Sequence, residues 1–219
     1  MFPVQHVMFR NITEEEYQDM ASCKCIRTAE YEKGSILFHA GDRTEEFGIV
    51  IYGEVHIENI DLWGNRVILH SLSANDAFAE TYAFCNVPML ADVTAAKSCK
   101  ILFLNIGVLL SPEYHTKSWY FKLISNLLLL STQKNLAWSN RIFCITAKSI
   151  RAKVMTFLSA EARKRESNEF SVPFDRQQMA DYLNVERSAL SKELAKMQKE
   201  GILEFHKNRF RLHKMEHFC

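Results

Sequence analysis

The sequence lacks a long hydrophobic run, a secretory leader and a large net charge. Its 219 residues include 27 Lys+Arg and 26 Asp+Glu, and no apolar run is longer than that of Leu127–Leu130. A membrane-spanning helix needs about 20 consecutive apolar residues, so this run is far too short. No N-terminal segment has a basic region, an apolar stretch and a cleavage site in that order. We therefore expect a cytoplasmic protein with no membrane partner and room for two domains.

Motifs that carry enzyme chemistry are also missing. The chain has no glycine-rich phosphate-binding loop, no nucleophile elbow and no paired-histidine metal motif with a catalytic glutamate. An enzyme needs such a set of groups at a defined spacing. We therefore predict no enzymatic activity and no cofactor.

The six cysteines do not form a recognisable ligand set. Cys23 and Cys25 are two residues apart and would share a face if they lay on a strand, whereas Cys85 and Cys99 follow much later. Disulfides are not the default in a cytosolic protein, and a buried cysteine behaves as a small hydrophobe. We predict no metal site, with a redox or metal role for these four cysteines as the alternative.

The stretch 174–194 is typical of two short amphipathic helices joined by a tight turn. Asp175 is placed to cap the first helix, and Gln178 completes a capping-box pattern. Asn184 lies where such turns usually need a left-handed residue. The expected buried positions are Met179, Ala180, Leu183, Leu190 and Leu194. This pattern predicts a helix-turn-helix, and the alternative is an ordinary helical hairpin with a solvated face.

The second of these helices carries hydrogen-bond donors on the side away from its leucines. They are Arg187, Ser188, Ser191 and Lys192. Short or cationic donors are suited to the base edges and phosphates of a major groove. The helix is therefore predicted to bind duplex DNA.

A basic β-hairpin is predicted directly after this helix. Gly201 is a good helix terminator, and apolar residues alternate with polar ones over 202–206 and 209–213. A helix-turn-helix followed by a hairpin is a winged helix, in which Lys207 and Arg209 are placed to contact the DNA backbone.

The charge of the chain is divided unevenly. Residues 146–219 carry 15 basic and 10 acidic side chains, whereas residues 1–145 carry 12 and 16. A basic C-terminal part attached to an acidic N-terminal part suits a nucleic-acid reader joined to a part that does not touch nucleic acid.

Residues 30–105 have the pattern of a compact β domain. The alternating runs are Ile36–Phe38, Gly48–Tyr52, Val55–Ile60, Val67–Leu72 and Lys100–Leu104. Turn signals between them are Gly34, Gly41-Asp42, Gly53 and Gly64-Asn65. Strands at this spacing predict a sandwich or a barrel. A helical element is expected over Asp76–Phe84.

The segment 112–146 has a helical pattern with no Gly or Pro after Pro112. One apolar stripe consists of Leu123, Leu127, Leu130, Ala137 and Cys144. A second consists of Ile124, Leu128, Trp138, Ile142 and Ile145. An exposed helix needs only one apolar stripe, so two stripes indicate contacts on two sides. We expect one stripe to cover the β domain and the other to contact a second subunit, which makes the protein a homodimer.

With these features in this order, the chain resembles the Crp/Fnr family of bacterial transcription regulators over nearly all of its length. Gly34, Gly41-Asp42, Gly53 and Asn-Asp-Ala-Phe-Ala-Glu at 75–80 resemble the family's cyclic-nucleotide-binding β-roll. The resemblance implies an α+β fold. Its parts are a double-stranded β-helix (β-roll or jelly-roll) effector domain at 1–111, a long dimerisation helix at 112–146 and a C-terminal winged helix-turn-helix at 147–219.

The resemblance implies a homodimeric transcription regulator that binds a near-palindromic operator in double-stranded DNA, and that contacts RNA polymerase if it is an activator. Arg176 and Gln177 fall where the family contacts phosphates. Arg187, Ser188 and Lys192 fall on the three positions that usually choose bases. Position 188 is often Glu in the family and pairs with cytosine, so its replacement by Ser implies a different preferred DNA sequence.

The resemblance also bears on the effector. In members that bind cyclic AMP, Phe-Gly-Glu is followed by Arg-Ser-Ala, whose Arg neutralises the cyclic phosphate. Here Glu80 is retained, but Ala79 replaces the Gly, and Leu90 and Ala91 replace the Arg and Ser. A phosphate would then face an apolar wall and a carboxylate, which is electrostatically unfavourable. We therefore expect a signal other than cyclic AMP.

A small-molecule effector of apolar or organic-acid character is one expectation, and a collapsed pocket without a ligand is another. The effector-binding residues would be Phe78, Glu80, Leu90, Ala91, Leu128 and Asn135. An iron–sulfur, haem or thiol redox-sensing regulator is an alternative, although iron–sulfur members carry three closely spaced N-terminal cysteines and this chain has two. A non-DNA-binding interaction module on the same fold is the other alternative.

Overall fold

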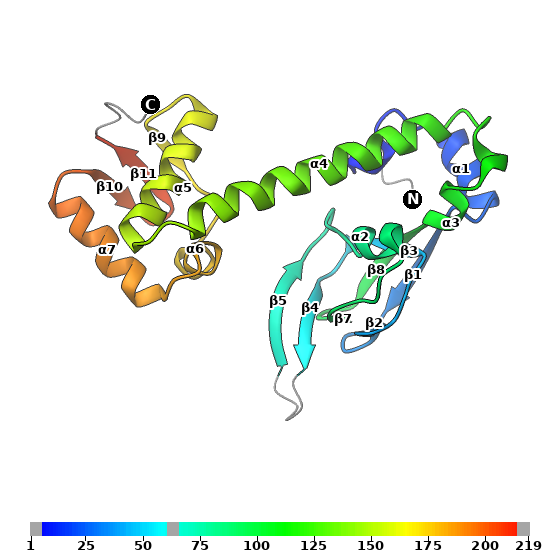
Figure 1. Ribbon diagram of the computed structural model, residues 1–219, viewed down its shortest axis with the longest axis horizontal. Helices are drawn as coiled ribbons and strands as arrows, with labels where there is room; N and C mark the ends of the chain where they lie inside the picture. The colour runs from blue at the N-terminus through cyan, green and yellow to red at the C-terminus, as the bar shows by residue number, and fades with distance from the viewer. Residues whose placement is uncertain (1–5, 61–65, 214–219) are drawn as a thin grey trace. The chain divides into compact units, whose positions relative to one another are not determined.

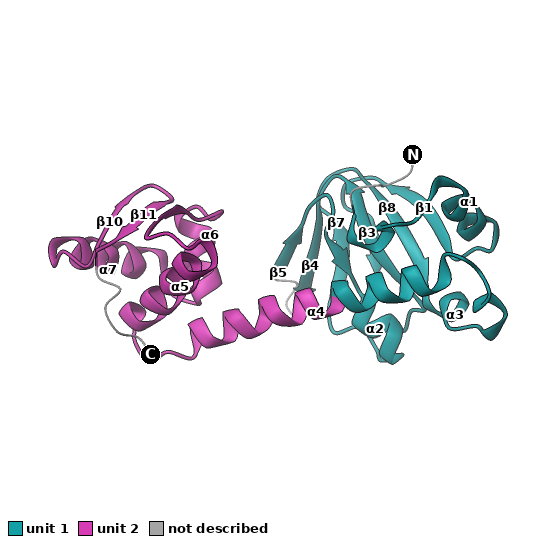
Figure 2. Cartoon of the chain, turned by 90° about the horizontal axis from the view of Figure 1, so that it is seen from above, with its two compact units in different colours: residues 1–130 teal, residues 131–219 magenta. Residues whose placement is uncertain are grey.

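The computed structural model describes residues 6–60 and 66–213, and the chain forms two compact units, Met1–Leu130 and Ser131–Cys219 (Figure 2). The units divide inside one long helix, α4 (Tyr120–Ile145), which contributes residues to both. Among the described residues, no helix is both long and apolar enough to cross a membrane. The turn predicted at Gly64-Asn65 lies outside the described ranges.

The first unit is a β-roll made of two four-stranded antiparallel sheets (Figure 1). One sheet has the strand order β1-β8-β3-β6, and the other has the order β2-β7-β4-β5. The strands are β1 (Ile26–Tyr31), β2 (Ile36–Phe38), β3 (Glu46–Tyr52), β4 (Val55–Ile60), β5 (Arg66–Leu72), β6 (Ala77–Phe78), β7 (Asp92–Ala95) and β8 (Cys99–Asn105). Most neighbouring strands are distant in sequence, so the pairing depends on the folding of the whole unit.

Short helices surround this roll. They are the 3₁₀ turns η1 (Val7–Phe9) and η2 (Pro112–Tyr114) and the α-helices α1 (Glu14–Ser22), α2 (Glu80–Cys85) and α3 (Ile106–Leu109). α1 begins at a capping box, in which Thr13 Oγ1 accepts a hydrogen bond from Glu16 N and Glu16 Oε2 accepts one from Thr13 N.

The N-terminal half of α4 is docked on the N-terminal elements of its own unit. Asn126 Nδ2 donates to the carbonyls of Met8 and Arg10 at 3.0 and 2.8 Å. Lys122 Nζ donates to Glu16 Oε1 at 2.7 Å, and the pKa of Glu16 is lowered. These contacts explain why the stripe residues Leu123, Leu127 and Leu130 are buried, as predicted. The other two members of the stripe lie in the second unit, where Ala137 is exposed and Cys144 belongs to the second core.

The long helix begins later than predicted. Pro112 starts a 3₁₀ turn instead, and α4 begins only at Tyr120. The segment between them is held by α1, because Asp19 accepts hydrogen bonds from Lys117 Nζ at 2.8 Å and from Trp119 Nε1 at 2.6 Å. A tertiary contact therefore interrupts a segment whose local pattern is helical.

The core of the roll requires a glycine at its centre. A Cβ atom added to Gly48 would lie 2.2 Å from Cζ of Phe78, which is 2 % exposed. The Phe78 ring meets Phe38 edge to face, with the ring centroids 6.1 Å apart, and Phe38 meets Phe103 in the same way at 6.0 Å. The aromatic side chains thus fill the space that the missing side chain leaves.

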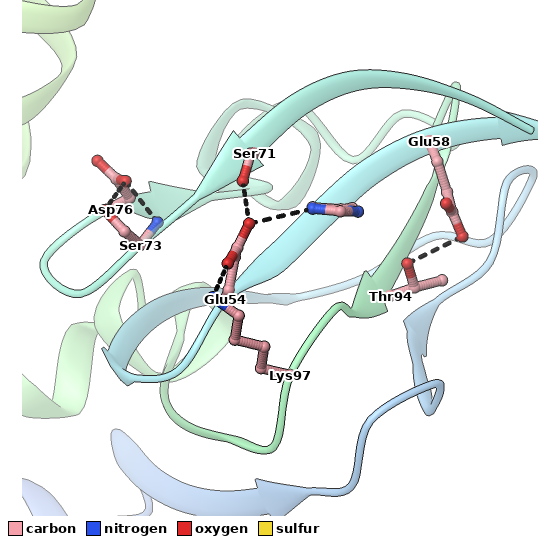
Figure 3. A network of polar contacts seen from close by, with 8 residues as sticks. Glu54, Glu58, Ser71, Ser73, Asp76, Thr94 and Lys97 are labelled. Carbon is pink, nitrogen blue, oxygen red and sulfur yellow. Dashed lines mark hydrogen bonds and ion pairs between the residues drawn. The ribbon is translucent and has the colours of Figure 1, made fainter.

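A polar network on the second sheet joins strands β4 and β5 to the turn before β8 (Figure 3). Glu54 accepts hydrogen bonds from Lys97 Nζ at 2.6 Å and from Ser71 Oγ at 2.8 Å, and lies 3.3 Å from His56 Nε2. These partners, Lys97 first, lower the pKa of Glu54 to about 2. Thr94 Oγ1 on β7 also donates to the buried Glu58 at 2.9 Å.

All five predicted strand runs of the first unit lie in strands, but β1, β6 and β7 were not predicted as strands, and the predicted helix at 76–84 is partly wrong. β1 contains several polar residues and β7 is very short, so neither has a clear local strand pattern. β1 forms by pairing with β8, and β7 forms by pairing with β4. The segment 77–78 pairs with β3 as β6, and Ala79 then adopts a left-handed conformation with φ 66° before α2 begins.

The second unit is a winged helix that includes the end of α4. It contains α5 (Ile150–Arg165), β9 (Glu169–Ser171), α6 (Arg176–Leu183), α7 (Arg187–Lys199), β10 (Leu203–His206) and β11 (Arg209–Leu212). The predicted hairpin is β10–β11, and β9 joins it in a sheet of order β10-β11-β9. The fold is therefore α+β, with a β-roll joined by a long helix to a winged helix-turn-helix.

Candidate nucleic-acid interface

The helix-turn-helix has the predicted local signals at both ends of its first helix. Asp175 Oδ1 accepts from Gln178 N at 2.8 Å, and Gln178 Oε1 accepts from Asp175 N at 2.9 Å. Asn184 ends α6 in the left-handed conformation with φ 50°. The capping box and the left-handed turn are confirmed, and together they set the angle at which the chain enters α7.

The predicted buried face of the two helices is also confirmed. Each of its residues is at most 1 % exposed: Met179, Ala180, Leu183, Leu190 and Leu194. Ala180 and Leu190 belong to the same core cluster. Because this side is closed, the opposite face of α7 is the one available to a partner.

Two cations bind the carbonyl groups at the C-terminal end of α6. Arg141 of α4 donates from Nε to the carbonyl of Tyr182 at 3.1 Å and from Nη2 to that of Asp181 at 3.0 Å. Lys153 of α5 donates to the carbonyls of Leu183 and Asn184 at 3.2 and 3.1 Å. The Asp181 carbonyl also accepts from Asn184 N at 3.2 Å, and cations are favoured at a helix C-terminus. The clamp of Arg141 and Lys153 therefore fixes the turn that leads into α7.

α7 is held from the side by α5. Arg151 donates from Nε to Glu193 Oε1 at 2.6 Å and from Nη1 to Glu200 Oε2 at 2.7 Å. The pKa of Arg151 is raised by these two carboxylates, Glu200 first, and the pKa of Glu200 is lowered by Arg151. The two contacts are about two turns apart along α7, so they fix its direction as well as its position.

The predicted base-reading residues all lie on the exposed face of α7. They are Arg187, Ser188, Ser191 and Lys192. Ser191 Oγ donates to the carbonyl of Arg187 at 3.0 Å, which is a local bond within the helix. Ser188 is engaged differently, because its hydroxyl donates to Glu186 Oε2.

Glu186 is the N-cap of α7. Its carboxylate accepts from Ser188 N at 2.9 Å and from Ala189 N at 3.1 Å. The hydrogen bonds to Ser188, first among the causes, lower the pKa of Glu186. The available signal was an acidic residue directly before the helix, where the N-terminal dipole favours a carboxylate.

The wing is tied to the first turn of α6 by Arg176. Its Nη2 donates to the carbonyl of Lys207 at 3.0 Å, and its guanidinium lies 5.0 Å from the Phe205 ring centroid and 5.7 Å from that of Phe210. Burial, and then the nearby Arg187, lower the pKa of Arg176. Arg176 therefore has a structural contact in addition to its predicted phosphate contact. Of its five N–H donors, one is used in this hydrogen bond.

Other predicted backbone-contacting residues surround this tie. Gln177 Nε2 donates to Asp181 Oδ1 at 2.9 Å. Lys207 is exposed in the wing turn with φ 54°, and Arg209 pairs with Glu169 at 2.7 Å while staying largely exposed. A hollow of about 460 Å³ lies between the wing turn and α6. It is lined by Pro173, Phe174, Asp175, Arg176, Lys207 and Asn208.

The residues predicted to bind an effector differ widely in their exposure. Phe78 and Ala91 are 2 % and 6 % exposed, and Phe78 is part of the aromatic core. Glu80 is half-buried in the first turn of α2. Leu90, which was predicted to replace the phosphate-binding arginine, is 79 % exposed. The Ala79 backbone nevertheless has the left-handed conformation that glycine favours.

The other two predicted effector residues lie on α4. Leu128 belongs to the first unit and is 64 % exposed. Asn135 belongs to the second unit, where its Oδ1 accepts from Ser139 Oγ at 3.5 Å. The grouping of all six residues into one effector site stays a prediction.

Three of the five cysteines that the structure describes are buried. Cys25, Cys99 and Cys144 are at most 3 % exposed, and burial raises the pKa of each thiol, that of Cys25 to about 12. Cys23 and Cys25 do not share a strand face, because Lys24 between them has φ 58° and ends α1. Over residues 6–60 and 66–213, no three His, Cys, Asp or Glu side chains form a group suited to a metal ion.

Fold and site together define a DNA-binding regulator that combines a β-roll with a winged helix. Residues 28–111 match the family model of the cyclic nucleotide-binding domain, and residues 152–219 match that of the Crp-like helix-turn-helix domain. The two matches follow each other in the order of the β-roll and the winged helix. The chain belongs to the Crp/Fnr family of bacterial transcription regulators.

Solved structures share this fold at low sequence identity. The catabolite activator protein of Thermus thermophilus is 18 % identical, with 94 % of this chain and 93 % of that chain covered and a TM-score of 0.51. CprK complexed with OCPA is 16 % identical, with 90 % and 92 % covered and a TM-score of 0.60. The c-di-GMP responsive global regulator CLP of Xanthomonas campestris is 14 % identical, with 91 % and 99 % covered and a TM-score of 0.55. None of the curated proteins compared with the chain matches it.

Proposed function

We propose that this protein is a homodimeric transcription regulator that acts in the cytoplasm, binds a near-palindromic operator and responds to a signal other than cyclic AMP. The observation that carries the proposal is the state of α7. The leucines of α7 are buried in the core, and Arg151 fixes the direction of the helix. The opposite face of α7 exposes Arg187, Ser191 and Lys192. A helix held in this way can enter a major groove without rearranging its own domain.

The exposed apolar side chains of α4 support the homodimer. Outside the N-terminal docking site, the helix exposes Leu136 by 63 %, Trp138 by 55 %, Ile142 by 53 % and Phe143 by 70 %. Trp138 and Ile142 lie four residues apart on one side of the helix, and Leu136 and Phe143 lie seven residues apart on another side. Exposed apolar side chains of this kind indicate a protein partner, and a second α4 offers the same side chains over the same length. In such a dimer the two α7 helices would enter successive major grooves roughly 34 Å apart, which accounts for a near-palindromic operator.

The proposal of a signal other than cyclic AMP is supported by the chemistry of the phosphate position. Leu90 offers no positive charge there, and the half-buried Glu80 would repel a cyclic phosphate if it lies near the ligand. The buried, high-pKa thiols of Cys25, Cys99 and Cys144 are poor nucleophiles, so they favour a structural role over redox sensing.

The test is selection of bound sequences from a random duplex pool with the purified protein under reducing conditions. A near-palindrome is the expected result, and its affinity should fall steeply as salt rises. Failure to enrich any sequence, both in the presence and in the absence of cell extract, would favour a non-DNA-binding interaction module.

Arg187→Ala in the same selection tests the assignment of the base-reading face. It should relax base preference at one position in each half-site, with a loss of about 1–3 kcal/mol on the preferred sequence. Lys207→Ala is the matched control, because a phosphate contact weakens binding to all sequences about equally and lowers the salt dependence. If Arg187→Ala behaved like Lys207→Ala, Arg187 would be a phosphate contact instead.

A further inference from the structure

The N-terminus of α7 presents a carboxylate next to a base-reading position. Glu186 accepts hydrogen bonds from the backbone N–H groups of Ser188 and Ala189 at 2.9 and 3.1 Å, and a third from the Ser188 hydroxyl. The side-chain tip of residue 188 and the carboxylate of residue 186 are therefore in direct contact. Both residues are exposed, so they are presented together.

This contact changes what position 188 offers to DNA. The N-terminal residues of a recognition helix are the ones that contact base edges. The Ser188 hydroxyl has a single proton, and Glu186 already accepts it, so Ser188 does not offer that proton to a base. The group that remains available at this position is the carboxylate, held in place by three donors.

We propose that Glu186, held by Ser188, is a specificity-determining residue that accepts a hydrogen bond from the exocyclic amine of cytosine or adenine in the major groove. The proposal rests on the DNA-binding function proposed above. A carboxylate has about four acceptor sites, three of which are filled here, so one remains for a base. Glutamate accepting from cytosine N4 is an established kind of base contact.

The same carboxylate discriminates against the other bases. It carries no proton, so it repels the N7 and O6 acceptors of guanine and the O4 acceptor of thymine. Its lowered pKa, caused first by the hydrogen bonds to Ser188, keeps it ionised at neutral pH. Lys192 on the same face contributes a positive charge, which offsets part of the repulsion between Glu186 and the DNA phosphates.

The experiment compares selected sequences for the full-length wild type, Glu186→Ser and Glu186→Gln. Serine is a preferred N-cap, so Glu186→Ser keeps the helix start but is too short to reach a base. The wild type should enrich C or A at one position of each half-site, and Glu186→Ser should lose this preference by about 5-fold or more. Glu186→Gln should instead shift the preference towards A, because an amide pairs with N6 and N7 of adenine. Thermal unfolding of each variant checks that the domain remains folded.

Two serine variants complete the design. Ser188→Ala removes one of the three donors to Glu186 and should weaken the same preference. Ser167→Ala is the matched control and should leave the preference unchanged, because Ser167 lies between α5 and β9, outside the proposed interface, and its hydroxyl donates to the Glu169 carbonyl. An unchanged preference in Glu186→Ser would overturn the proposal and leave Glu186 as a helix cap only.

Two further outcomes would also count against the proposal. Tighter binding of Glu186→Ser to every sequence, with no change in base preference, would show that the carboxylate only repels phosphates. Selection of G or T at that position by the wild type would contradict the chemistry of the acceptor. A wild type that enriches no sequence at all would overturn the proposed function, which is a distinguishable failure.

Discussion

Removal of the Arg141 guanidinium should loosen the junction between α4 and the helix-turn-helix. We consider Arg141→Met, which keeps most of the aliphatic stem but loses the two hydrogen bonds to the Tyr182 and Asp181 carbonyls. It also loses two cation–π contacts, in which the guanidinium lies 5.7 Å from the Tyr182 ring centroid and 5.6 Å from the Trp138 ring centroid. The end of α6 would then keep the hydrogen bonds from Lys153 to the carbonyls of Leu183 and Asn184.

The expected cost follows from these contacts. A hydrogen bond to a charged group contributes about 1.5–3 kcal/mol when shielded, and an exposed cation–π contact about 0.5–1 kcal/mol. Arg141 is only partly buried and solvent can replace its bonds, so we discount the sum to about 2 kcal/mol. Because the clamp fixes α7 and not its base contacts, DNA affinity should also fall by a similar factor on all sequences.

Urea unfolding monitored by circular dichroism measures this cost, and binding to the selected operator and to a scrambled duplex measures the second effect. Lys148→Met is the matched control, since Lys148 is an exposed cation between α4 and α5. Its expected cost is below about 0.5 kcal/mol. Equal costs for the two variants would refute the clamp, and a change in base preference with Arg141→Met would show a direct role in sequence recognition.

Two further predictions concern the β-roll. The pKa of Glu54 is about 2 in the folded state and near 4.5 in the unfolded chain. The ionised carboxylate therefore stabilises the folded state at pH values above 4.5, and this contribution is lost as the pH falls from 4.5 towards about 2. Glu54→Gln should flatten the dependence of the unfolding free energy on pH between these two values. If the unfolding free energies of wild type and variant changed with pH in the same way, this result would contradict the network in Figure 3. Gly48→Ala should cost about 1–3 kcal/mol by overpacking against the Phe78 ring. Phe78→Leu should cost less in the Gly48→Ala background than alone, and simple additivity in chemical denaturation would argue against the clash.

Features set by neighbouring residues in the chain were predictable. The capping box at Asp175, the left-handed turn at Asn184 and the buried face of α6 and α7 depend on residues within one or two turns of each other. The Lys207 turn is equally local. These parts of the fold were therefore predicted correctly from spacing and residue type.

Features set by distant partners were not predictable. β7 has four residues and exists because β2 and β4 pair with it, and α4 starts late because Asp19 holds Lys117 and Trp119. Within the site, the tie from Arg176 to the wing depends on the packing of the whole domain. The N-cap at Glu186, by contrast, depends on its neighbours Ser188 and Ala189 in the chain.

Ala79 has a left-handed backbone although it is not a glycine. Such a conformation costs an alanine about 1 kcal/mol or more, so the residue itself does not favour it. It is imposed from both sides, by the pairing of Phe78 with Gly48 before the turn and by the hydrogen bond from Ala83 N to the Ala79 carbonyl after it. The surroundings thus prescribe the path of this loop, and its side chains can be exchanged while that path persists. If this loop forms a binding surface, single substitutions can change its side chains during evolution while the backbone keeps the same path.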